Sequence, residues 1–434
     1  MHLEAIDTHA ADWRSALDRV YQELGGGTNA TLLPYHFLQA AFPHLGGRLY
    51  RARCDEQLSA VLFVFPHLTT NRQAARRPDE IPADLSAGMA TPNDLLGYIA
   101  RCHWLVAPQP TEVTAVQQLL CQTLDSDAVT LYNPAEEHSF TATSHTLGVL
   151  NIGRPNAVEA AAIRQLQEQI WRSPPEYLYP TDIHSADFPL GTSLVARVDD
   201  KVAGFLFGFY KEHGPTLPWD WEQRWRGALR IESQVMGVLP AQRGLRIGYF
   251  LKRIQAEQAL AQGIGIIHWT VDPLQYPNAA LNFGLLRAVA FTFTPDYYPF
   301  RNELNQGPAS RFSLTWLIGS ARVQVQPLHD ARSTILPLAH HPEIQRINDG
   351  WRQADLAATA PMLAVEIPAD WTSLQRQNPE EAVQWRATTD QIFSHYIGSE
   401  PGKYVVTDVA VEDERRYLII QQVTEYLWQR LEET

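Results

Sequence analysis

Residues 237–248, with the sequence GVLPAQRGLRIG, combine glycines and two arginines at the junction of an expected strand and an expected helix. Glycine lets the backbone take positive φ angles and approach a ligand closely. Successive N–H groups at a helix N-terminus bind anions, usually phosphates. Arg243 and Arg246 add positive charge to this loop. The segment therefore predicts a phosphate-binding loop; the alternative is an ordinary strand–helix turn that carries surface arginines.

The residues around the loop are basic, although the chain as a whole has a net charge of −13. Between residues 224 and 253, Glu232 is the only acid. The basic residues there are Arg224, Arg226, Arg230, Arg243, Arg246, Lys252 and Arg253. A local basic patch suits the phosphates of a cofactor. The alternative is a charged surface that faces only solvent.

Neighbouring elements must position this loop. An expected strand, Ala228–Leu239, precedes it, and an expected helix, Tyr249–Gln262, follows it and leads into a strand over Ile264–Val271. Upstream, Ser193–Tyr210 consists of two strand-like runs on either side of Asp199-Asp200, a pattern typical of a β-hairpin. These elements together predict a sheet whose strand ends beside the loop.

The length of 434 residues predicts more than one domain. We expect segments at 1–143, 145–320 and 321–434. The first two share an order of helix, hairpin and strand–helix–strand, which suggests a degenerate duplication. The polar segment Pro66–Pro92 is expected to be an exposed excursion. Further strands are expected over Thr146–Ile152, Phe291–Tyr298 and Ala321–Val325, and further helices over Ala11–Leu24, Asn156–Trp171, Asn278–Ala290, Pro379–Ile397 and Arg416–Glu432.

The composition argues against several classes of function. A hydrophobic fraction of 45% with 19% charged residues indicates a folded, soluble protein. The net charge of −13 argues against binding to nucleic acids or to anionic membranes. The three cysteines form no CxxC pair and the histidines show no metal-ligand spacing, so we expect neither disulfides nor a metal. With no signal peptide and no long apolar run, the sequence predicts a cytoplasmic protein, either a monomer or a homodimer.

The middle segment resembles the GNAT family of acyltransferases, which use acyl-coenzyme A. The shared pattern is a hairpin, a long strand, a loop of the form Arg-Gly-x-Gly-x-Gly (here Arg243–Gly248), a helix and a parallel strand. The run Trp269–Leu274, followed by Asn278 and Asn282, resembles a little-studied bacterial group of predicted GNAT acetyltransferases. Downstream residues of that group are matched by Arg311-Phe312, Trp316, Val365–Pro368, Trp385-Arg386 and Tyr404–Val406. The resemblance extends over roughly residues 145–420.

This resemblance implies a mixed α/β fold: a GNAT acyl-CoA N-acyltransferase domain, a degenerate GNAT-like N-terminal unit and a C-terminal α+β extension. In the family, backbone amides of the loop hold the coenzyme A pyrophosphate, and the end of the preceding strand pairs with the pantetheine arm. The cofactor-binding residues carried over to this chain are Met236, Val238, Arg243, Gly244, Arg246, Ile247, Gly248, Asn278 and Asn282. The arm would lie where Ala228–Leu239 and Ile264–Val271 separate.

Catalysis in this family is direct attack of an amine on the thioester, with the protein supplying mainly position and a polarised carbonyl. Glu232 lies where several members keep a general base. A half-buried carboxylate there can have a raised pKa suited to taking a proton from an amine. The alternative role of Glu232 is an ion pair with Arg230 or Arg253.

Three positions depart from the family pattern. Arg246 replaces the central loop glycine, and it either crowds the pyrophosphate or clamps it with its guanidinium. Phe283 stands nearest to the tyrosine that protonates the thiolate in many members. Arg287 replaces a frequent glycine before the last strand. Tyr297-Tyr298 could supply the missing hydroxyl, or could serve only for packing.

Two further groups each have a functional and a structural interpretation. Asp272-Pro273-Leu274 and Asn278 either contact substrate or pantetheine amides, or form a turn with Asn278 as a helix N-cap. The tryptophans of residues 212–227 either form a lid or aromatic acceptor pocket, or anchor a long loop. These tryptophans are Trp219, Trp221 and Trp225.

The sequence therefore predicts a GNAT-type N-acetyltransferase. We expect transfer from acetyl-CoA to a small primary amine or amino-acid-like acceptor, in a ternary complex. The alternative is a non-catalytic acyl-CoA-binding or scaffolding protein, which Phe283 and Arg246 would favour. A tandem GNAT enzyme that takes aminoacyl groups from tRNA is less compatible with the acidic net charge.

Overall fold

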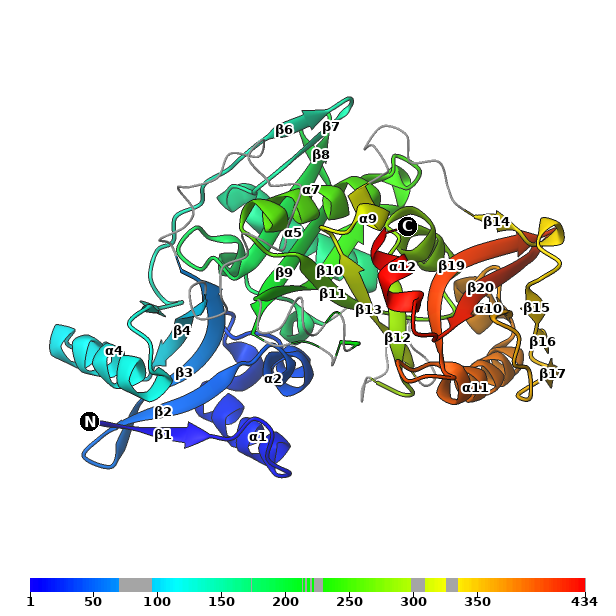
Figure 1. Ribbon diagram of the computed structural model, residues 1–434. Helices are drawn as coiled ribbons and strands as arrows, with labels where there is room; N and C mark the ends of the chain where they lie inside the picture. The colour runs from blue at the N-terminus through cyan, green and yellow to red at the C-terminus, as the bar shows by residue number, and fades with distance from the viewer. Residues whose placement is uncertain are drawn as a thin grey trace. The chain divides into compact units, whose positions relative to one another are not determined.

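The protein forms two compact units in a computed structural model (Figure 1). Unit 1 comprises Met1–Gly214 and Arg226–Ile264, and unit 2 comprises Pro215–Trp225 and Gly265–Thr434. The structure describes residues 1–69, 96–172, 174–212, 214, 217–218, 221, 229–297, 309–324 and 335–433. The expected excursion at Pro66–Pro92 therefore lies largely outside the described residues. The division at 143 and 320 stays a prediction.

Unit 1 contains two sheets, of which the first is built from residues 2–132. Its strand order is β1-β2-β3-β4-β5, and only the β4–β5 pair among these ladders is parallel. The strands are β1 His2–Ile6, β2 Arg48–Cys54, β3 Gln57–Leu68, β4 Leu96–Trp104 and β5 Val129–Tyr132. The helical elements of this region are α1 Trp13–Glu23, η1 Gly26–Thr28, η2 Phe37–Ala41, α2 Phe42–His44 and α4 Pro110–Leu124.

The strands that lead to Arg243–Gly248, the Gly/Arg loop, follow one another as an antiparallel series within unit 1. They are β6 His145–Leu147, β7 Leu150–Gly153, β8 Gly191–Val198, β9 Lys201–Lys211 and β10 Arg230–Val238. The predicted hairpin at Ser193–Tyr210 is confirmed, and Asp199 and Asp200 turn with φ of 48° and 59°. The single strand expected over Thr146–Ile152 is wrong: Gly148, at φ 62°, turns the chain between β6 and β7.

Two helices cover opposite faces of this series. Helix α5 (Ala157–Trp171) packs on the face that carries Val195, and helix α7 (Ile247–Ala261) packs on the face that carries Leu194 and Ala196. Successive strand residues point to opposite faces, so β8 contributes to two separate cores. Short helical turns complete the region: η5 Pro175–Tyr177, η6 Thr181–His184 and η7 Pro240–Gln242.

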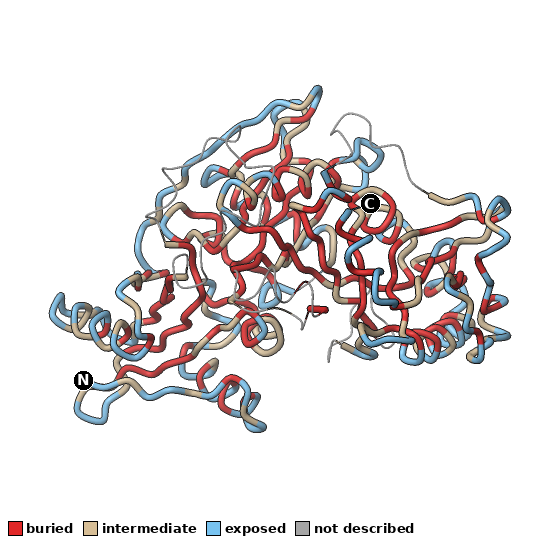
Figure 2. Tube along the Cα trace, in the orientation of Figure 1, coloured by how far each residue is buried: buried red, intermediate tan, exposed pale blue. Residues whose placement is uncertain are grey.

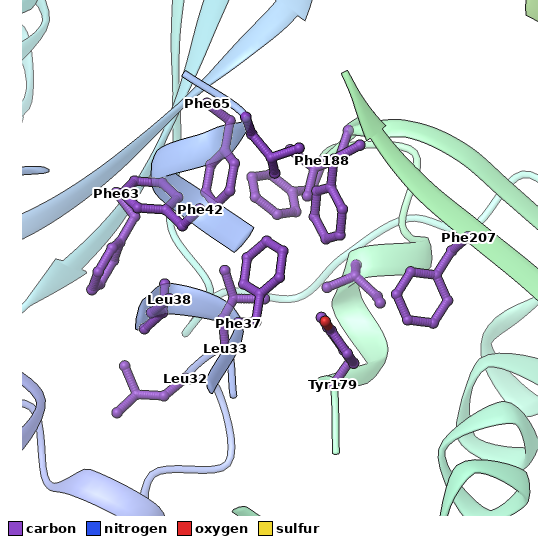
Figure 3. Packing of buried hydrophobic residues seen from close by; sticks show 14 of the residues in the cluster. Leu32, Leu33, Phe37, Leu38, Phe42, Phe63, Phe65, Tyr179, Phe188 and Phe207 are labelled. Atoms are coloured by element: carbon purple, nitrogen blue, oxygen red, sulfur yellow. The ribbon is translucent and has the colours of Figure 1, made fainter. Parts of the chain in front are cut away.

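An aromatic core joins the two sheets of unit 1. Phe63 and Phe65 of β3 lie in the same cluster as Phe207 and Phe209 of β9, with Phe37 between them (Figure 3). Figure 2 shows that β3, β4 and β9 are largely buried, whereas β1 and much of α4 are exposed. Aromatic side chains bury more apolar area than other residues, so this cluster is a main source of stability for unit 1.

A buried ion pair also belongs to unit 1. Arg101 of β4 is fully buried, and its Nη1 donates to Asp182 Oδ2 at 2.6 Å. The Tyr132 hydroxyl donates to the same oxygen at 2.6 Å. Burial alone would raise the pKa of the Asp182 carboxyl, but the Arg101 guanidinium holds it below its ordinary value. The pair therefore keeps its charges inside the core.

Unit 2 is a second mixed region, with strand order β15-β18-β20-β19-β12-β13-β11 and β14 beside β19. Its main strands are β11 Ile266–Val271, β12 Val289–Thr294, β13 Arg311–Leu317, β18 Met362–Ile367, β19 Tyr404–Glu412 and β20 Arg415–Gln422. Short strands are β14 Leu336–Pro337, β15 Gln345–Arg346, β16 Asn348–Asp349 and β17 Gln353–Ala354. Its helical elements are α8 Tyr276–Ala279, η8 Ala280–Leu285, α9 Ala321–Gln324, η9 Leu338–His340, α10 Trp371–Gln377, α11 Pro379–Tyr396 and α12 Leu427–Glu433.

Several sequence expectations in unit 2 are wrong. Residues 321–324 form helix α9 instead of a strand. The helix expected over Arg416–Glu432 is instead strand β20 followed by α12, because Tyr417–Ile420 is buried between the neighbouring strands β18 and β19. The helix expected over Asn278–Ala290 ends early, and β12 begins at Val289. The predicted mixed α/β fold with a C-terminal extension is confirmed.

Candidate cofactor site

The Gly/Arg loop connects β10 to α7 and is exposed. After η7, Gly244 takes φ 102° and Arg246 takes φ 56°, both in the left-handed region. Helix α7 then begins at Ile247, and its first main-chain bond is from Phe250 N–H to Arg246 O at 3.1 Å. The backbone thus turns sharply enough for the loop to lead directly into the helix N-terminus.

The N-terminus of α7 differs from those of α4 and α5. Asn156 and Glu159 form a capping box on α5, and Gln109 and Glu112 form one on α4. At α7, the N-cap residue Arg246 makes no side-chain capping bond, and the first turn has no acidic residue. The positive end of the helix dipole is therefore neither capped nor neutralised by its own sequence, which favours an anion there.

The end of β10 directs a row of peptide groups away from β9. Leu239 N–H donates to Ala203 O at 2.9 Å, and Gly237 pairs with Phe205 in the same register. Because antiparallel residues alternate between hydrogen-bonded and non-bonded positions, the N–H and C=O groups of Met236 and Val238 point to the opposite edge. These are the two residues that the sequence assigned to the pantetheine arm, and their peptide groups lead toward the loop.

A β-bulge interrupts β10 just before this row. Ser233 and Gln234 together face one residue of β9, Gly208, between the pairs Glu232–Phe209 and Val235–Phe207. A Cβ atom added to Gly208 would lie 2.5 Å from Glu232 O and 3.1 Å from Ser233 Cα. The glycine therefore lets the bulged backbone pass close to β9. A bulge of this kind bends a strand and changes the direction of its side chains.

Glu232, the candidate general base, precedes the bulge and is half-buried. Its Oε2 accepts from Lys211 Nζ at 2.8 Å, so its ion-pair partner is neither Arg230 nor Arg253. His44 lies close enough for the charges of Lys211 and Glu232 to affect its pKa, which burial lowers. The Lys211 ammonium therefore holds the Glu232 carboxylate in place beside the bulge. Its catalytic role stays a prediction.

Two polar side chains lie on the buried face of α7. Lys252, which the sequence placed in an exposed basic patch, is 2% exposed, and Gln255 is fully buried. Lys252 Nζ donates to Ser233 Oγ at 2.8 Å, and Gln255 Nε2 donates to Thr192 Oγ1 at 3.1 Å. The burial of Lys252 and Gln255 was not predicted, although a spacing of three residues places both side chains on one face of a helix.

The expected contacts Asn278 and Asn282 belong to unit 2. Asn278 is exposed in α8, whose N-cap is Gln275, so the expected capping role of Asn278 is wrong. Asn282 is 3% exposed in η8, and its carbonyl accepts from Ala288 N–H at 2.9 Å. Their role toward a cofactor stays a prediction.

Residues of the downstream signature form a buried ion-pair cluster in unit 2. Arg386 Nη2 of α11 donates to both oxygens of Asp272, at 2.9 and 2.8 Å. Arg311 Nη1 lies 3.7 Å from Asp272 Oδ2, and the Arg386 guanidinium stacks over Trp371. The Asp272 side chain also accepts from Leu274 N–H at 3.0 Å. These contacts give Asp272 the structural role that the sequence left open.

Of the aromatic residues proposed for a lid, an acceptor pocket or a proton-donating hydroxyl, some are described by the structure and others are not. Trp221 is buried against Phe291 and Trp428, and its Nε1 donates to Trp428 O at 3.3 Å. This residue therefore anchors its segment instead of lining an acceptor pocket. Trp219, Trp225 and Tyr298 lie outside the described residues. Tyr297 is partly exposed, and its N–H donates to Ala309 O at 3.1 Å.

Within the described ranges, no three His, Cys, Asp or Glu side chains are arranged to hold a metal ion. The same ranges contain no helix long and apolar enough to cross a membrane.

Comparison with known proteins gave no matching family model and no matching curated protein. Among solved structures, a GNAT-family acetyltransferase from Streptococcus pneumoniae aligns at 13% identity and a TM-score of 0.28, over 38% of this chain and 97% of its own. Arabidopsis thaliana Naa50 with a bisubstrate analogue aligns at 15% identity and a TM-score of 0.30, over 38% of this chain and 97% of its own. Diaminobutyrate acetyltransferase from Paenibacillus lautus, with its substrate and coenzyme A, aligns at 14% identity and a TM-score of 0.29, over 39% of this chain and 95% of its own.

The chain resembles GNAT acetyltransferases of known structure. At these identities and TM-scores the matches carry no argument about superfamily or activity. The resemblance to a bacterial group stays a prediction.

Both arginines that replace expected GNAT glycines keep a glycine-like backbone. Arg246 has φ 56° and Arg287 has φ 58°. A residue with a Cβ pays about 1–2 kcal/mol for this left-handed conformation. Phe283, at the expected tyrosine position, is 1% exposed and packs edge-on against Phe312, so it is a core residue. At Arg246 and Arg287 the backbone therefore takes the conformation that the expected glycine would favour, although each position carries an arginine side chain.

Replacing Arg246 with glycine should show whether its side chain clamps the pyrophosphate or crowds it. We expect Arg246→Gly to stabilise unit 1 by up to about 1 kcal/mol, because glycine removes the left-handed strain. We also expect coenzyme A binding to weaken about fivefold, because one charged donor is lost. Chemical denaturation and calorimetry measure the two effects.

Arg172→Gly is the matched control for this variant, since Arg172 is also left-handed, at φ 50°, but caps the other end of a different helix, α5. Its coenzyme A affinity should equal that of the wild type. Tighter binding by Arg246→Gly would show that Arg246 crowds the pyrophosphate.

Proposed function

We propose that the protein is an acyl-CoA-dependent N-acyltransferase, with acetyl-CoA as donor and a small primary amine or amino-acid-like molecule as acceptor. The observation that carries this proposal is the continuity between the peptide edge of Met236 and Val238 and the uncapped N-terminus of α7. An extended chain of amides that ends in a pyrophosphate fits this arrangement. Coenzyme A has that chemistry.

In the proposed complex, the pyrophosphate lies against the loop and the first turn of α7. Ile247 and Gly248 supply helix N–H groups, Gly244 supplies a loop N–H with no side chain in the way, and Arg243 and Arg246 supply charge. The pantetheine amides pair with Met236 and Val238 as an added strand would. Asn278 and Asn282 are proposed as further polar contacts.

The proposed reaction is direct transfer in a ternary complex. The acceptor amine attacks the thioester carbonyl, and Glu232 takes the proton that the nitrogen loses. Binding both substrates side by side supplies most of the rate, since it replaces a collision in solution by a positioned encounter. This reaction requires no metal, and we place the protein in the cytoplasm.

A bulky side chain at Gly248 tests the proposed site. Wild-type protein is expected to gain several degrees in Tm when coenzyme A or acetyl-CoA is added at a hundredfold excess over Kd, because ligand binding stabilises the folded state. Gly248→Trp should lose this gain, because the indole would occupy the first turn of α7. The measurement is a thermal-shift titration.

Ala261→Trp provides the control, since Ala261 is exposed at the last residue of the same helix. It should keep the wild-type shift. Absence of any shift in wild-type protein with either ligand would refute the proposed function. If both ligands bind, release of thiol from acetyl-CoA with a panel of primary amines separates an enzyme from a non-catalytic acyl-CoA-binding protein.

A further inference from the structure

A buried polar patch lies between α7 and the sheet at the bulge of β10. Its members are Ser233 of β10, Thr192 of β8, and Lys252 and Gln255 of α7, each 6% exposed or less. A Cβ atom on Gly208 would lie 3.3 Å from Gln255 Nε2, so the glycine borders the patch. The surroundings are apolar residues such as Leu251 and Ile254. Burying polar groups in such a core costs free energy unless they are hydrogen-bonded.

The bulge turns Ser233 toward this patch. Val235 packs in the core on the α5 side, whereas Met236 and Val238 pack in the core on the α7 side. Regular alternation would place Ser233 on the same side as Val235. Its hydrogen bond to Lys252 shows that it instead faces α7. The extra residue in β10 therefore positions this one hydroxyl.

The patch is incompletely hydrogen-bonded. A serine hydroxyl has one proton to donate and two lone pairs. Lys252 occupies one lone pair of Ser233 Oγ, and within the part of the chain that the structure describes the serine proton has no acceptor. Gln255 Oε1 is buried and also lacks a partner among those residues. Buried groups of this kind normally find a partner, so a bound molecule is the natural source of one.

We propose that Ser233 donates its hydroxyl proton to the sulfur of coenzyme A, and that Lys252 is the positioning residue that holds and reprotonates it. This inference rests on the proposed function, because the pantetheine arm along Met236 and Val238 leads its sulfur to the bulge. It supplies the hydroxyl that the core residue Phe283 cannot provide. Ser233 would be the catalytic residue for the leaving group.

The proton balance of the step closes within these groups. The acceptor nitrogen bonds to the acetyl carbon and gives its proton to Glu232. The carbon–sulfur bond breaks with its electron pair on sulfur, and sulfur takes the Ser233 proton. Ser233 recovers a proton from the Lys252 ammonium, and the proton on Glu232 then restores Lys252. The products are the amide and the free thiol of coenzyme A.

The setting of Lys252 suits this exchange. Burial holds the pKa of its ammonium well below the usual range, and the charge of Glu232 partly opposes that shift. A lowered pKa makes the lysine ammonium a stronger acid than an exposed one, so it gives up a proton more readily. Among the described residues, Glu232 of β10 is the charged group that affects its pKa, and Lys211 of β9 lies beyond that carboxylate.

Coenzyme A and desulfo-coenzyme A, which differ by the sulfur, test this donor without an acceptor. The measurement is made at alkaline pH, where part of the coenzyme A thiol is ionised, because a hydrogen bond to a thiolate is charge-assisted and worth about tenfold in affinity. We expect wild-type protein to bind coenzyme A about tenfold more tightly than desulfo-coenzyme A in calorimetry. The ratio should fall to about one in Ser233→Ala and to an intermediate value in Lys252→Met.

Thr192→Val is the matched control, since it removes a hydroxyl from the same patch without touching Ser233, and its ratio should stay near tenfold. General loss of structure would weaken both ligands equally and leave the ratio unchanged. A tenfold ratio retained in Ser233→Ala, or a ratio of one in the wild type, overturns the role of Ser233 and leaves the proposed function standing. If wild-type protein binds neither ligand, both the role of Ser233 and the proposed function fail.

Discussion

Gly208→Ala is expected to lower the free energy of unfolding of unit 1 by about 3 kcal/mol, because it forces a methyl group against packed backbone. The new Cβ would lie 2.5 Å from Glu232 O and 3.1 Å from Ser233 Cα. Backbone atoms cannot rotate away as a side-chain end can, so β9 and β10 must separate. The bulge would then shift, and coenzyme A affinity should fall as well. Urea denaturation followed by calorimetry measures both effects.

Gly284→Ala is a suitable comparison, because among the described residues its added Cβ would meet the end of the Val409 side chain, at 3.3 Å. It should change stability by less than about 1 kcal/mol. If Gly208→Ala were as stable as the wild type, the close passage of the bulge over β9 would not be a constraint.

Asp272→Ala is expected to cost about 4 kcal/mol in unit 2, because it removes a buried carboxylate that lies against two buried arginines. Asp272 is 8% exposed, Arg386 5% and Arg311 8%. The loss should be far larger than that from an exposed pair such as Arg346 and Glu412, which is worth below about 1 kcal/mol. Denaturant unfolding of Asp272→Ala and Glu412→Ala gives the comparison.

A second substitution identifies the cause of that loss. If an unpaired cation destabilises Asp272→Ala, adding Arg386→Met should restore part of the stability, since it removes the charge and keeps an apolar stem over Trp371. Losses that simply add in the double variant would indicate that packing, and not charge, dominates this cluster.

Much of the local structure could be predicted from the sequence, because local signals determine it. Asp199-Asp200 marked the hairpin turn, and Pro240 and Gly244 marked the end of β10. Contacts between distant residues could not be predicted. Nothing near Tyr417 signals that it lies between two strands, and helix periodicity alone was consistent with residues 416–432.

In the candidate site too, local features could be predicted from the sequence and contacts between distant residues could not. The loop and the start of α7 follow from glycine and arginine types at fixed spacing. The burial of Lys252 and its bond to Ser233 depend on a bulge, and the bulge depends on Gly208 in the neighbouring strand. A basic residue in a basic stretch is most simply interpreted as exposed. Only the packing of α7 on the sheet shows otherwise.

The aromatic core of unit 1 affects how the chain could be shortened or recombined. Phe63 and Phe65 lie before residue 143, and Phe207 and Phe209 lie after it, yet they share one cluster. A protein cut to begin near residue 145 would leave the phenylalanine face of β9 open to water. The N-terminal 143 residues therefore cover one face of the strand that leads to the proposed cofactor site, so the two parts of unit 1 depend on each other for a closed core.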